Sequence, residues 1–592
     1  MEKQIKTSVK EGVSKLYHTD IKESAILIQN TKKEFKGDFT LVVFPLLKIS
    51  KKGPEETATE LGNYLQKELN HISGYNVIQG FLNLELQDSF WATFLASLQD
   101  KPFIELSKQK GMGTIMVEYS QPNTNKPLHL GHLRNNILGY SLANILKANG
   151  NQVIKANIIN DRGIHICKSM LAWHKWGKGE TPQSASMKGD KLVGKYYVQF
   201  DKHYKEEIAE LESGGISKEE ASKKAPLILE AQEMLRKWES GDAETVKLWR
   251  TMNDWVLKGF DITYKEFGVD FDKIYYESET YLLGREIVMD GINKGYFYKK
   301  EDASVWCDLD NSKLDHKLVL RSDGTSVYIT QDIGTATQRF SDYSLDQLIY
   351  VVGDEQNHHF KVLFEILKKM GFPWAANCHH LSYGMVELPS GKMKSREGTV
   401  VDADDLMENM AIIAQQLSEE LGKMEGLDSK EKQELYRIIG LGALKYFLIK
   451  VDPKKKMMFN PEESIDFNGN TGPFIQYTYA RIQSLVRKQQ QNMDSIELVT
   501  PKKLAIQEKQ LIKHMYQFPA IIHEAANALS PALVANYVYE VAKSFNHYYQ
   551  ALPILKADQQ EVVNFRIHLS KTTGELIKTC MNLLGIEMPN RM

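Results

Sequence analysis

The sequence predicts a multidomain α/β protein. A Rossmann-like parallel-sheet domain with a helical insertion lies between a small α+β domain and an all-α bundle. Three observations support this fold class. The 592 residues correspond to about four domains at roughly 150 residues each. A strand, a helix and a second strand follow one another within residues 114–159, and helical periodicity dominates from residue 402 to the end.

These patterns divide the chain into four regions. We expect an N-terminal α+β domain at 1–110, the sheet domain at 111–386, a basic loop with a connecting helical segment at 387–455, and a helical domain at 456–592. The glycines of Gly111-Met112-Gly113 mark the end of the first region.

The N-terminal region combines both kinds of secondary structure. Its apolar run at 41–46 predicts a buried strand, the periodicity of 56–69 predicts a helix, and the alternation at 76–84 predicts a strand or hairpin. A small α+β domain accommodates all three.

The sheet domain begins with a βαβ unit. Apolar runs at 114–119 and 153–159 predict buried strands, and the apolar residues between 133 and 146 recur at helical spacing before Gly150 ends the helix. A βαβ unit implies a parallel sheet. The Lys- and Glu-rich stretch at about 175–255 interrupts this alternation, and we interpret it as surface helices inserted into the domain.

The later parts of the chain show the same two periodicities. Further strands are predicted at 304–307, 326–329, 348–352 and 381–386. Helices are predicted at 435–450, 474–488, 504–529 and 531–552, which together form a bundle.

The composition is that of an ordinary globular protein, with 42% hydrophobic and 25% charged residues. The 74 Lys and Arg nearly balance the 76 Asp and Glu, so the chain is not a nucleic-acid binder that acts by bulk charge alone. From residue 453 onward, however, 16 Lys and Arg stand against 12 Asp and Glu. The helical tail is therefore the basic part, which suits selective RNA binding by shape and stacking beside charge.

The four cysteines and the hydropathy profile bear on the cellular environment. No two of the cysteines lie within 70 positions of each other, so neither a disulfide framework nor a cysteine-based zinc site is expected. The first residues lack an apolar signal segment, and no run of 18 apolar residues occurs. We expect a cytoplasmic protein that does not enter a membrane.

The most informative string runs from Val117 to His132, between the first strand and the first long helix of the βαβ unit. Ligands bind at such places in open α/β sheets, and the helix start attracts anions. His129 and His132 are three residues apart and can project from one turn, while Gly131 allows a ring or a backbone to approach closely. This pattern suits a nucleoside triphosphate; the alternative is a loop with two ordinary surface histidines.

A second string, Ser390 to Thr399, carries Lys392, Lys394 and Arg396 between glycines. A basic loop of this kind can close over phosphates and stabilise charge that develops in a transition state. On its own it is equally compatible with a solvated charged turn.

Together and in this order, the two strings resemble the H-I-G-H and K-M-S-K-S signatures of class I aminoacyl-tRNA synthetases, and in particular the arginyl-tRNA synthetase family. Ser120-Gln121-Pro122-Asn123 with Lys126 resembles that family's S-x-P-N-x-x-K block. Tyr328 and Asp332 match its Y-x-x-x-D, and Gln356 matches its Q-x-x-H-F. Residues 470–482 and 530–549 are similar to its anticodon-domain helices. The matches run from about residue 114 to the C-terminus.

The resemblance implies an activity and a set of substrates. Arginine is joined to its tRNA through an arginyl-adenylate, with ATP as substrate and Mg²⁺ accompanying the ATP, and without protein-bound zinc. It also implies that arginine activation needs bound tRNA, that no editing domain exists, and that the protein is a monomer.

The resemblance assigns residues to each substrate. For catalysis and ATP it implies His129, Gly131, His132, Lys126, Lys392, Met393, Lys394, Ser395 and Arg396. For arginine it implies Glu118, Gln121, Pro122, Asn123, His132, Tyr328, Asp332 and Gln356. For tRNA it implies Tyr477, Tyr479, Arg481, Asn546 and Tyr549.

The chemistry of arginine supports part of this set. Its guanidinium is a fixed planar fork of donors that stays charged, so a selective site needs a carboxylate that accepts two parallel N–H bonds. Asp332 suits that role, although an Asp is also favoured as a helix N-cap. Glu118, at the end of a predicted strand, is a second candidate for which a core or loop role is equally compatible.

Two places depart from the family pattern. Ser395 stands where the second lysine of K-M-S-K-S is usual, and Lys126, just before the histidines, is in a position to supply the missing charge. Which of Lys392, Lys394 and Arg396 reaches the phosphates stays open. The string Asn160-Asp161-Arg162-Gly163 replaces the family's commoner aspartate-tryptophan-glycine and has no assigned role.

Three other functions fit the sequence less well. A synthetase for an acidic amino acid would need a cation where Asp332 lies, and a cysteinyl enzyme would need zinc ligands. A small-molecule nucleotidyltransferase shares the H-x-G-H type of site but has no use for a helical tail of about 140 residues. A non-catalytic tRNA-binding paralogue would not need both histidines and the basic loop.

Overall fold

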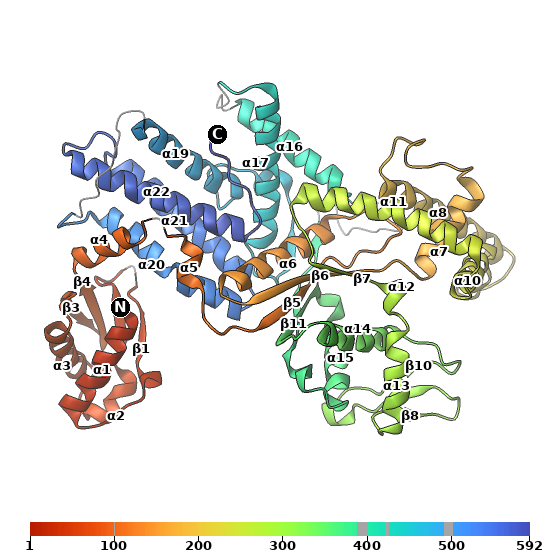
Figure 1. The fold of residues 1–592 in the computed structure, drawn as a ribbon, viewed down its shortest axis with the longest axis horizontal. Coiled ribbons are helices and arrows are strands. Elements are labelled where there is room, and N and C mark those ends of the chain that lie inside the picture. The colour runs from red at the N-terminus through yellow and green to blue at the C-terminus, as the bar shows by residue number, and fades with distance from the viewer. Residues whose placement is uncertain (33, 100, 388–400, 421–425, 491–500) are drawn as a thin grey trace. The chain divides into compact units, whose positions relative to one another are not determined.

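The computed structural model describes residues 1–592 except 33, 100, 388–400, 421–425 and 491–500 (Figure 1). The contacts divide the chain into two compact units. The first contains residues 1–102, 485–517 and 544–573, and the second contains 103–484, 518–543 and 574–592. Four helices of the C-terminal region therefore contribute one part of their length to each unit.

The first unit contains an antiparallel sheet in the order β1-β2-β4-β3. Its strands are β1 (Leu27–Asn30), β2 (Phe39–Val42), β3 (Ile72–Ile78) and β4 (Phe81–Leu86). The helices of the same region are α1 (Glu2–Tyr17), α2 (Leu47–Ser50), α3 (Pro54–Glu68) and α4 (Asp88–Ser97). The predicted α+β character of this region is confirmed.

Bundle residues pack against this sheet within the first unit. The buried carboxylate of Asp38 lies 2.5 Å from Lys513 Nζ and also accepts the backbone N–H of Leu86. Tyr516, three residues after Lys513, contacts the rings of Phe39 and Trp91 edge to face. A paired charge beside aromatic packing joins the two segments.

The second unit is built on a five-stranded parallel sheet in the order β12-β11-β5-β6-β7. Its strands are β5 (Thr114–Glu118), β6 (Gln152–Ile159), β7 (Lys273–Tyr276), β11 (Gln347–Gly353) and β12 (Cys378–Tyr383). The chain builds outward from β5 through β6 to β7 and then crosses to β11 on the other side. This is the Rossmann-like arrangement that the sequence predicts, and its switch point lies between β5 and β11.

Helices cover the parallel sheet, whose central strands are buried. Met116, Val117, Leu348, Ile349 and Val351 have no exposed surface, as expected for a parallel sheet covered on both faces. The helices of this domain are α5 (Phe103–Ser107), α6 (Leu130–Ala148), α12 (Glu277–Thr280), α13 (Leu283–Asn293), α14 (Tyr328–Asp342) and α15 (Asn357–Lys369).

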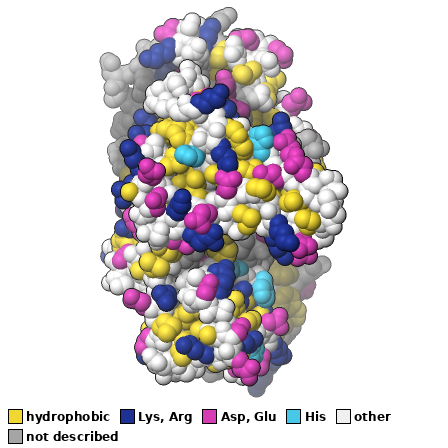
Figure 2. Space-filling model, turned by 90° about the vertical axis from the view of Figure 1, so that its right-hand side faces the viewer, with side chains coloured by type: hydrophobic (Ala, Val, Ile, Leu, Met, Phe, Trp, Pro, Cys, Tyr) yellow, Lys and Arg dark blue, Asp and Glu magenta, His cyan; other side chains and the backbone are white. Residues whose placement is uncertain are grey.

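A helical insertion separates β6 from β7. It comprises α7 (Ile164–Trp176), α8 (Gly189–Ser213), α9 (Lys218–Lys224), α10 (Pro226–Glu239) and α11 (Ala243–Phe267). The insertion is thus longer than the 175–255 predicted, because α7 and α11 extend it at both ends. Figure 2 shows the side on which α8 and α10 lie, where both signs of charge are interspersed rather than gathered into one patch.

Smaller sheets and the C-terminal helices complete the second unit and the bundle. The small strands are β8 (Tyr298–Lys299), β9 (Val305–Cys307), β10 (Lys317–Leu320), β13 (Val386–Glu387) and β14 (Met457–Met458). The helices are α16 (Ala403–Glu420), α17 (Ser429–Ile449), α18 (Pro461–Ser464), α19 (Gly472–Gln490), α20 (Ile506–Asn527), α21 (Pro531–Ala551) and α22 (Gln560–Leu583). Among the described helices, none combines the length and the apolar character needed to cross a bilayer.

Two local predictions were wrong. The segment 326–329 is not a strand, because α14 begins at Tyr328 and Thr330 Oγ1 accepts the N–H of Val327 at 3.4 Å to close its first turn. The strand predicted at 41–46 ends at Val42, and Pro45 lies in a short 3₁₀ turn, since proline fixes φ and lacks an N–H. The region after residue 402 is nearly all helical, as predicted, and its described residues also contain the two-residue strand β14, which pairs with β13.

The four cysteines are buried and unpaired, in agreement with the absence of a disulfide framework.

Candidate active site

The H-x-G-H string lies at the start of α6, after the loop that follows β5. His129 is the N-cap of the helix, and its Nδ1 accepts the backbone N–H of Gly131 at 3.1 Å. The Nδ1 of His132 accepts the backbone N–H of His129, also at 3.1 Å. The two ring centroids are 3.9 Å apart. The predicted projection of both imidazoles from one turn is therefore present in the structure.

These hydrogen bonds fix the chemical form of both rings. Each Nδ1 is an acceptor, so in the neutral ring the proton is on Nε2. Burial, with a smaller contribution from the nearby Lys126 cation, lowers the pKa of His129 to about 3. The pKa of His132 is lowered far below its usual value for the same principal reason. The site thus contains two neutral Nε2–H donors rather than two cations.

Gly131 lies close to the ring of His129. A Cβ at residue 131 would lie 3.0 Å from His129 Cε1, which is tighter than ordinary contact. A side chain at residue 131 would therefore push against the imidazole of His129, which accepts the N–H of residue 131.

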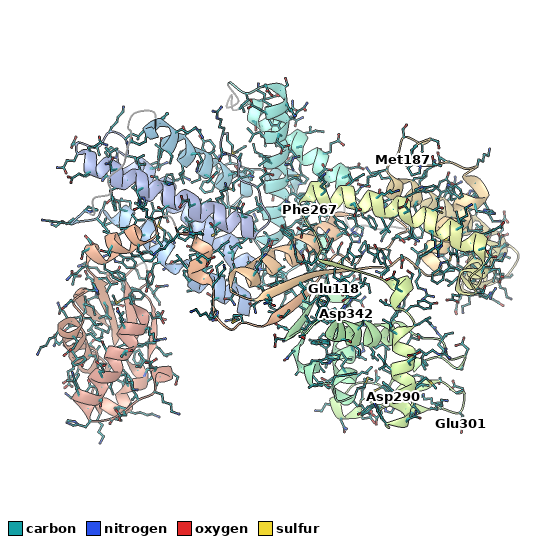
Figure 3. The ribbon with its side chains drawn as sticks, viewed as in Figure 1. Glu118, Met187, Phe267, Asp290, Glu301 and Asp342 are labelled. Carbon is teal, nitrogen blue, oxygen red and sulfur yellow. The ribbon has the colours of Figure 1, made fainter. Side chains whose placement is uncertain are left out.

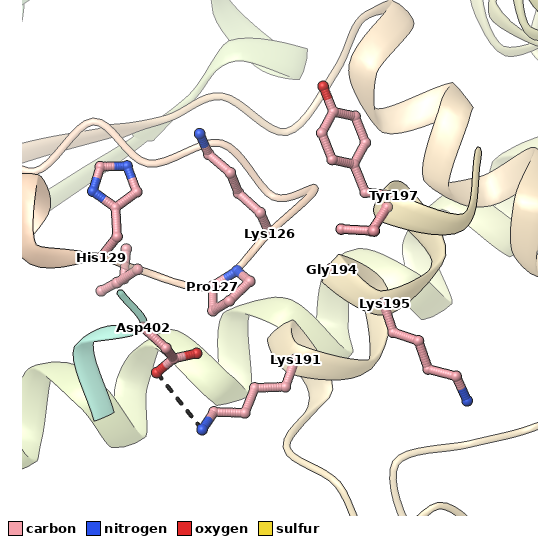
Figure 4. Close-up of a pocket in the computed structure, with 10 residues that line it drawn as sticks. Lys126, Pro127, His129, Lys191, Gly194, Lys195, Tyr197 and Asp402 are labelled. Carbon is pink, nitrogen blue, oxygen red and sulfur yellow. Dashed lines mark ion pairs between the residues drawn. The ribbon is translucent and has the colours of Figure 1, made fainter. Parts of the chain in front are cut away.

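Lys126 and His129 line a cavity of about 230 Å³ in the second unit, together with Lys191 of α8 and Asp402 (Figure 4). Lys191 Nζ is 3.6 Å from Asp402 Oδ1, the ion pair marked in Figure 4. Lys126 thus lies near His129, and its contribution of charge to the phosphates stays a prediction. Residues Lys392, Met393, Lys394, Ser395 and Arg396 lie outside the described residues.

A second cavity, of about 360 Å³, lies at the carboxyl ends of β5, β6, β7 and β11. It therefore lies where ligands bind in open α/β sheets. Five of the residues predicted to bind arginine line it: Glu118, Gln121, Tyr328, Asp332 and Gln356. The other three predicted arginine-binding residues, Pro122, Asn123 and His132, are not among the described residues that line this cavity. Pro122 is buried, and Asn123 forms a β-bridge with Asn160.

Tyr328 and Asp332 project from one face of α14, because they are four residues apart on the helix. Asp332 is thus inside the helix and is not its N-cap. Its side chain is 39% exposed, and its Oδ2 accepts a hydrogen bond of 2.6 Å from His359 Nε2. Tyr328 is 78% exposed, which leaves its hydroxyl accessible to a ligand. The pair offers a carboxylate and a hydroxyl to the cavity.

Glu118 combines the two roles that the sequence left open, since it lines the cavity and is also buried in the core. Figure 3 labels it at the end of β5, above α14, and its carboxylate is buried and paired with the guanidinium of Arg339 from α14. Its Oε1 also accepts a 3.1 Å hydrogen bond from Gln121 Nε2. Burial raises the pKa of Glu118, and the neighbouring Arg339 partly opposes that shift. One oxygen of this carboxylate is therefore already occupied by an internal guanidinium.

Glu277 is a cavity residue that the sequence analysis missed. It directly follows β7, begins α12 and lines the same cavity as Asp332. Its Oε1 accepts a 2.9 Å hydrogen bond from Gln331 Nε2, and burial raises its pKa. The position directly after a parallel strand was the available signal, but β7 itself was not predicted.

The string Asn160-Asp161-Arg162-Gly163, left without a role by the sequence analysis, lies at the carboxyl end of β6. Asn160 lines the cavity with Glu277 and Gln121. Asp161 is 3% exposed, and its two carboxylate oxygens accept hydrogen bonds from the N–H and Oγ of Ser278.

The residues predicted to bind tRNA differ in accessibility. Arg481 lies over the ring of Tyr477 on α19, with Cζ 4.9 Å from the ring centroid, and both are partly exposed. On α21, Asn546 is partly exposed and Tyr549 is 39% exposed. Tyr479 is only 3% exposed and its hydroxyl donates to Asn590 Oδ1 at 3.4 Å. The prediction for Tyr479 is not supported, because α19 turns it into the protein core.

A Rossmann-like sheet, an H-x-G-H turn at the start of the first helix and a C-terminal helical bundle together define a class I aminoacyl-tRNA synthetase. Models of three families match the chain in agreement with this class. The class I (R) tRNA synthetase catalytic domain matches residues 96–460, the DALR anticodon binding domain matches 475–592, and the arginyl tRNA synthetase N-terminal domain matches 3–86.

Curated relatives specify the family. The chain is 56% identical over 595 residues to the arginine–tRNA ligase of Bacteroides fragilis, with 100% of both chains covered. It is 55% identical to that of Flavobacterium psychrophilum, covering 99% of this chain and 98% of the relative. The Thermus thermophilus arginyl-tRNA synthetase structure matches the fold with a TM-score of 0.80 at 23% identity, over 100% of both chains. The chain belongs to the arginyl-tRNA synthetase family.

Proposed function

We propose that this chain is an arginine–tRNA ligase that uses the 360 Å³ cavity to bind L-arginine and the region around His129 and His132 to bind ATP. The observation that carries the proposal is that Glu277 and Asp332 both line one cavity. This cavity lies at the carboxyl ends of the parallel strands, and the H-x-G-H turn follows one of them, β5. Two carboxylates suit a guanidinium, which presents donors in a fixed fork.

The distribution of charge in the cavity supports a cationic ligand. Glu118 is neutralised by Arg339, so Glu277 and Asp332 are the carboxylates left to pair with a substrate cation. Arginine binding would favour the charged form of Glu277, whose pKa burial otherwise raises. Tyr328 and Gln356 supply further polar contacts from the cavity wall. Pro122, Asn123 and His132 do not line this cavity.

The first reaction step joins arginine to ATP. An oxygen of the arginine carboxylate attacks the α-phosphorus and pyrophosphate leaves, so no protein nucleophile is needed. The Nε2–H groups of His129 and His132 donate to phosphate oxygens on which charge develops, and Lys126 adds a cation. Lys392, Lys394 and Arg396 are proposed to add further charge. Mg²⁺ accompanies ATP and is held largely by phosphates and water.

The second step transfers the arginyl group to the terminal adenosine of the tRNA, and AMP leaves. Tyr477, Arg481, Asn546 and Tyr549 are proposed tRNA contacts, with the region 456–592 as the anticodon-binding domain and 1–110 as an additional tRNA-contacting domain. Residues 111–386 then form the catalytic domain and 387–455 the connection. We propose that the protein acts as a monomer in the cytoplasm.

The proposal is tested by ATP-dependent charging of tRNA with arginine, lysine and citrulline. Citrulline has the shape of arginine but carries a neutral ureido group, so the two carboxylates would lose their ionic partner. We expect charging with arginine only, and pyrophosphate exchange only when tRNA is present. Efficient charging with citrulline would contradict the role of the carboxylates, and exchange without tRNA would contradict tRNA-dependent activation.

A further inference from the structure

The Asn160-Asp161 pair connects the two walls of the arginine cavity. One wall is the loop from Gln121 to Thr124, which follows β5, and the other is the start of α12, which carries Glu277. Both walls lie at the carboxyl ends of strands that neighbour β6 in the sheet. Asn160 and Asp161 leave β6 between them.

Asn160 holds the first wall through three hydrogen bonds. Its N–H donates to Pro122 O at 2.9 Å, its carbonyl accepts the N–H of Thr124 at 3.1 Å, and its Nδ2 donates to Gln121 O at 3.2 Å. This loop needs support, because Ser120 and Gln121 have φ values of 83° and 46°, a region that residues other than glycine adopt at a cost.

Asp161 holds the second wall at the residue next to Glu277. Its Oδ1 accepts the N–H of Ser278 at 2.8 Å, and its Oδ2 accepts from Ser278 Oγ at 2.7 Å. Asp161 is itself fixed, because its carbonyl accepts from Trp249 Nε1 of α11 at 2.6 Å. The two carboxylate oxygens of the buried Asp161 each accept one hydrogen bond from Ser278, and together these bonds fix the path of the backbone at Ser278.

Arg162 adds a second attachment at the far end of α12. Its guanidinium lies over the ring of Tyr281, 4.0 Å from the centroid, and its Nη2 is 2.7 Å from Glu239 Oε1 of α10. The segment that carries Glu277 is therefore held on both sides by consecutive residues of one string.

We infer that Asp161 is a positioning residue for arginine recognition that acts on the substrate through Glu277, while Asn160 supports the opposite wall, which it also lines. The inference rests on the proposed role of Glu277 as an arginine ligand. Neither Asp161 nor Ser278 lines the cavity, so their hydrogen bonds affect arginine only through the wall that they orient.

The chain offers a graded set of variants at this contact. Asp161→Ala removes both acceptors, whereas Asp161→Asn can keep both bonds, since its Oδ1 accepts the Ser278 N–H and its Nδ2 donates to Ser278 Oγ. Ser278→Ala removes one bond only. We expect the KM for arginine to rise about tenfold in Asp161→Ala, less in Ser278→Ala and least in Asp161→Asn. The KM for ATP should stay near that of the wild type in all three.

A double-mutant cycle distinguishes positioning from general destabilisation. In full-length protein assayed for aminoacylation, Glu277→Gln should raise the KM for arginine, and adding Asp161→Ala to it should cause no further rise. Asp346→Ala is the matched control. Asp346 Oδ2 also accepts a backbone N–H, that of Thr114 at 2.7 Å, but at the opposite end of β5. It should change the melting temperature without a selective effect on arginine.

The outcomes distinguish a failure of the ligand role of Glu277 from a failure of the positioning role of Asp161. An unchanged KM for arginine in Glu277→Gln would overturn the ligand role of Glu277 and the positioning inference with it. A raised KM in Glu277→Gln combined with an additive effect of Asp161→Ala would overturn the positioning inference alone, as would equal rises in the KM values for arginine and ATP. If Asp161→Ala does not fold, Ser278→Ala replaces it in the cycle.

Discussion

The Nδ1 atom of His132 accepts the backbone N–H of His129, the residue whose own ring caps the same helix. The two imidazoles therefore fix each other's tautomer, and both present Nε2–H groups. Because their pKa values are lowered by burial, that of His129 to about 3, the pair stays neutral throughout the range in which the protein would work.

His132→Ala is expected to lower the rate of adenylate formation by about two orders of magnitude or more, while the protein still folds. The ring supports a loop–helix junction rather than the apolar core, so the melting temperature should change little. Pyrophosphate exchange in the presence of tRNA measures the rate of adenylate formation, and a thermal melt measures the melting temperature. A collapsed melt would favour a structural role for the histidine.

Because both imidazoles are neutral, we expect the rate of adenylate formation to show no titration from these rings near neutral pH. A histidine with an ordinary pKa near 6.5 would make the adenylation rate change between pH 6 and 8. With the pKa of His129 at about 3, its protonation state does not change in that interval. The rate of adenylate formation at saturating arginine, ATP and tRNA should show no titration attributable to these rings, and the wild-type and His129→Asn profiles should have the same shape over pH 6–8.

Gly131→Ala is expected to lower the adenylation rate without unfolding the protein, since the new Cβ would lie 3.0 Å from His129 Cε1 and displace that ring. Gly139→Ala provides a contrast on the same helix. A Cβ there would clash with the buried ring of Tyr119, so it should mainly lower the melting temperature. Equal thermal destabilisation by both substitutions would show that Gly131 has no specific role.

Asp332→Asn is expected to raise the KM for arginine by about tenfold or more and to leave the KM for ATP near its wild-type value, because only the amino acid carries a guanidinium. Asp342→Asn is the matched control at the end of the same helix, where its Oδ2 accepts from Tyr275 Oη at 3.1 Å. An arginine dependence that is unchanged in Asp332→Asn would remove this carboxylate from the site.

The parts of the site that the sequence predicts correctly are those in which the interaction is local. His129, Gly131 and His132 lie within one turn, so spacing alone indicates their relation. The shared helix face of Tyr328 and Asp332 was not predicted, because the sequence pattern predicts a strand at the start of that helix. Glu277 could not be found in this way, because its place beside Asp332 depends on β7, which follows an insertion of about a hundred residues. The pairing of Glu118 with Arg339 joins residues more than two hundred positions apart, and no periodicity encodes it.

The same limit applies to the secondary structure. Val327 and Ile329 alternate as in a strand, yet the hydrogen bond between Thr330 Oγ1 and the Val327 N–H closes a helical turn. Short apolar runs do not distinguish a strand from the start of a helix, and tertiary contacts decide between them.

Arg481→Ala is expected to raise the KM for tRNA and to make that KM less dependent on salt, because one cation that can pair with phosphate is lost. The guanidinium already stacks on Tyr477, so Arg481→Lys should restore charge but not the planar stack and should recover only part of the affinity. Tyr479→Phe is the control on the same helix, since that ring is buried. A Tyr479→Phe effect as large as that of Arg481→Ala would contradict the placement of these residues.

Lys445 of α17 predicts a pH dependence of stability. Its ammonium is buried, donates to Gly585 O at 2.8 Å, and has a pKa lowered to about 7 by desolvation, with a smaller contribution from Arg437. In the unfolded chain the pKa of a lysine is about 10.4. Between these two values the unfolded state binds more protons than the folded state, so this residue makes the free energy of unfolding increase with pH, by at most about 1.4 kcal/mol per pH unit.

Lys445→Met removes this titration and keeps an apolar side chain of similar length. Relative to the wild type, the variant should therefore be most stable at or below pH 7 and should lose that relative advantage steadily between pH 7 and 9.5. Urea unfolding of both proteins across that range measures the difference, in which the titration of all other groups cancels. A difference that stays constant with pH would mean that Lys445 is protonated to the same extent in the folded and unfolded states.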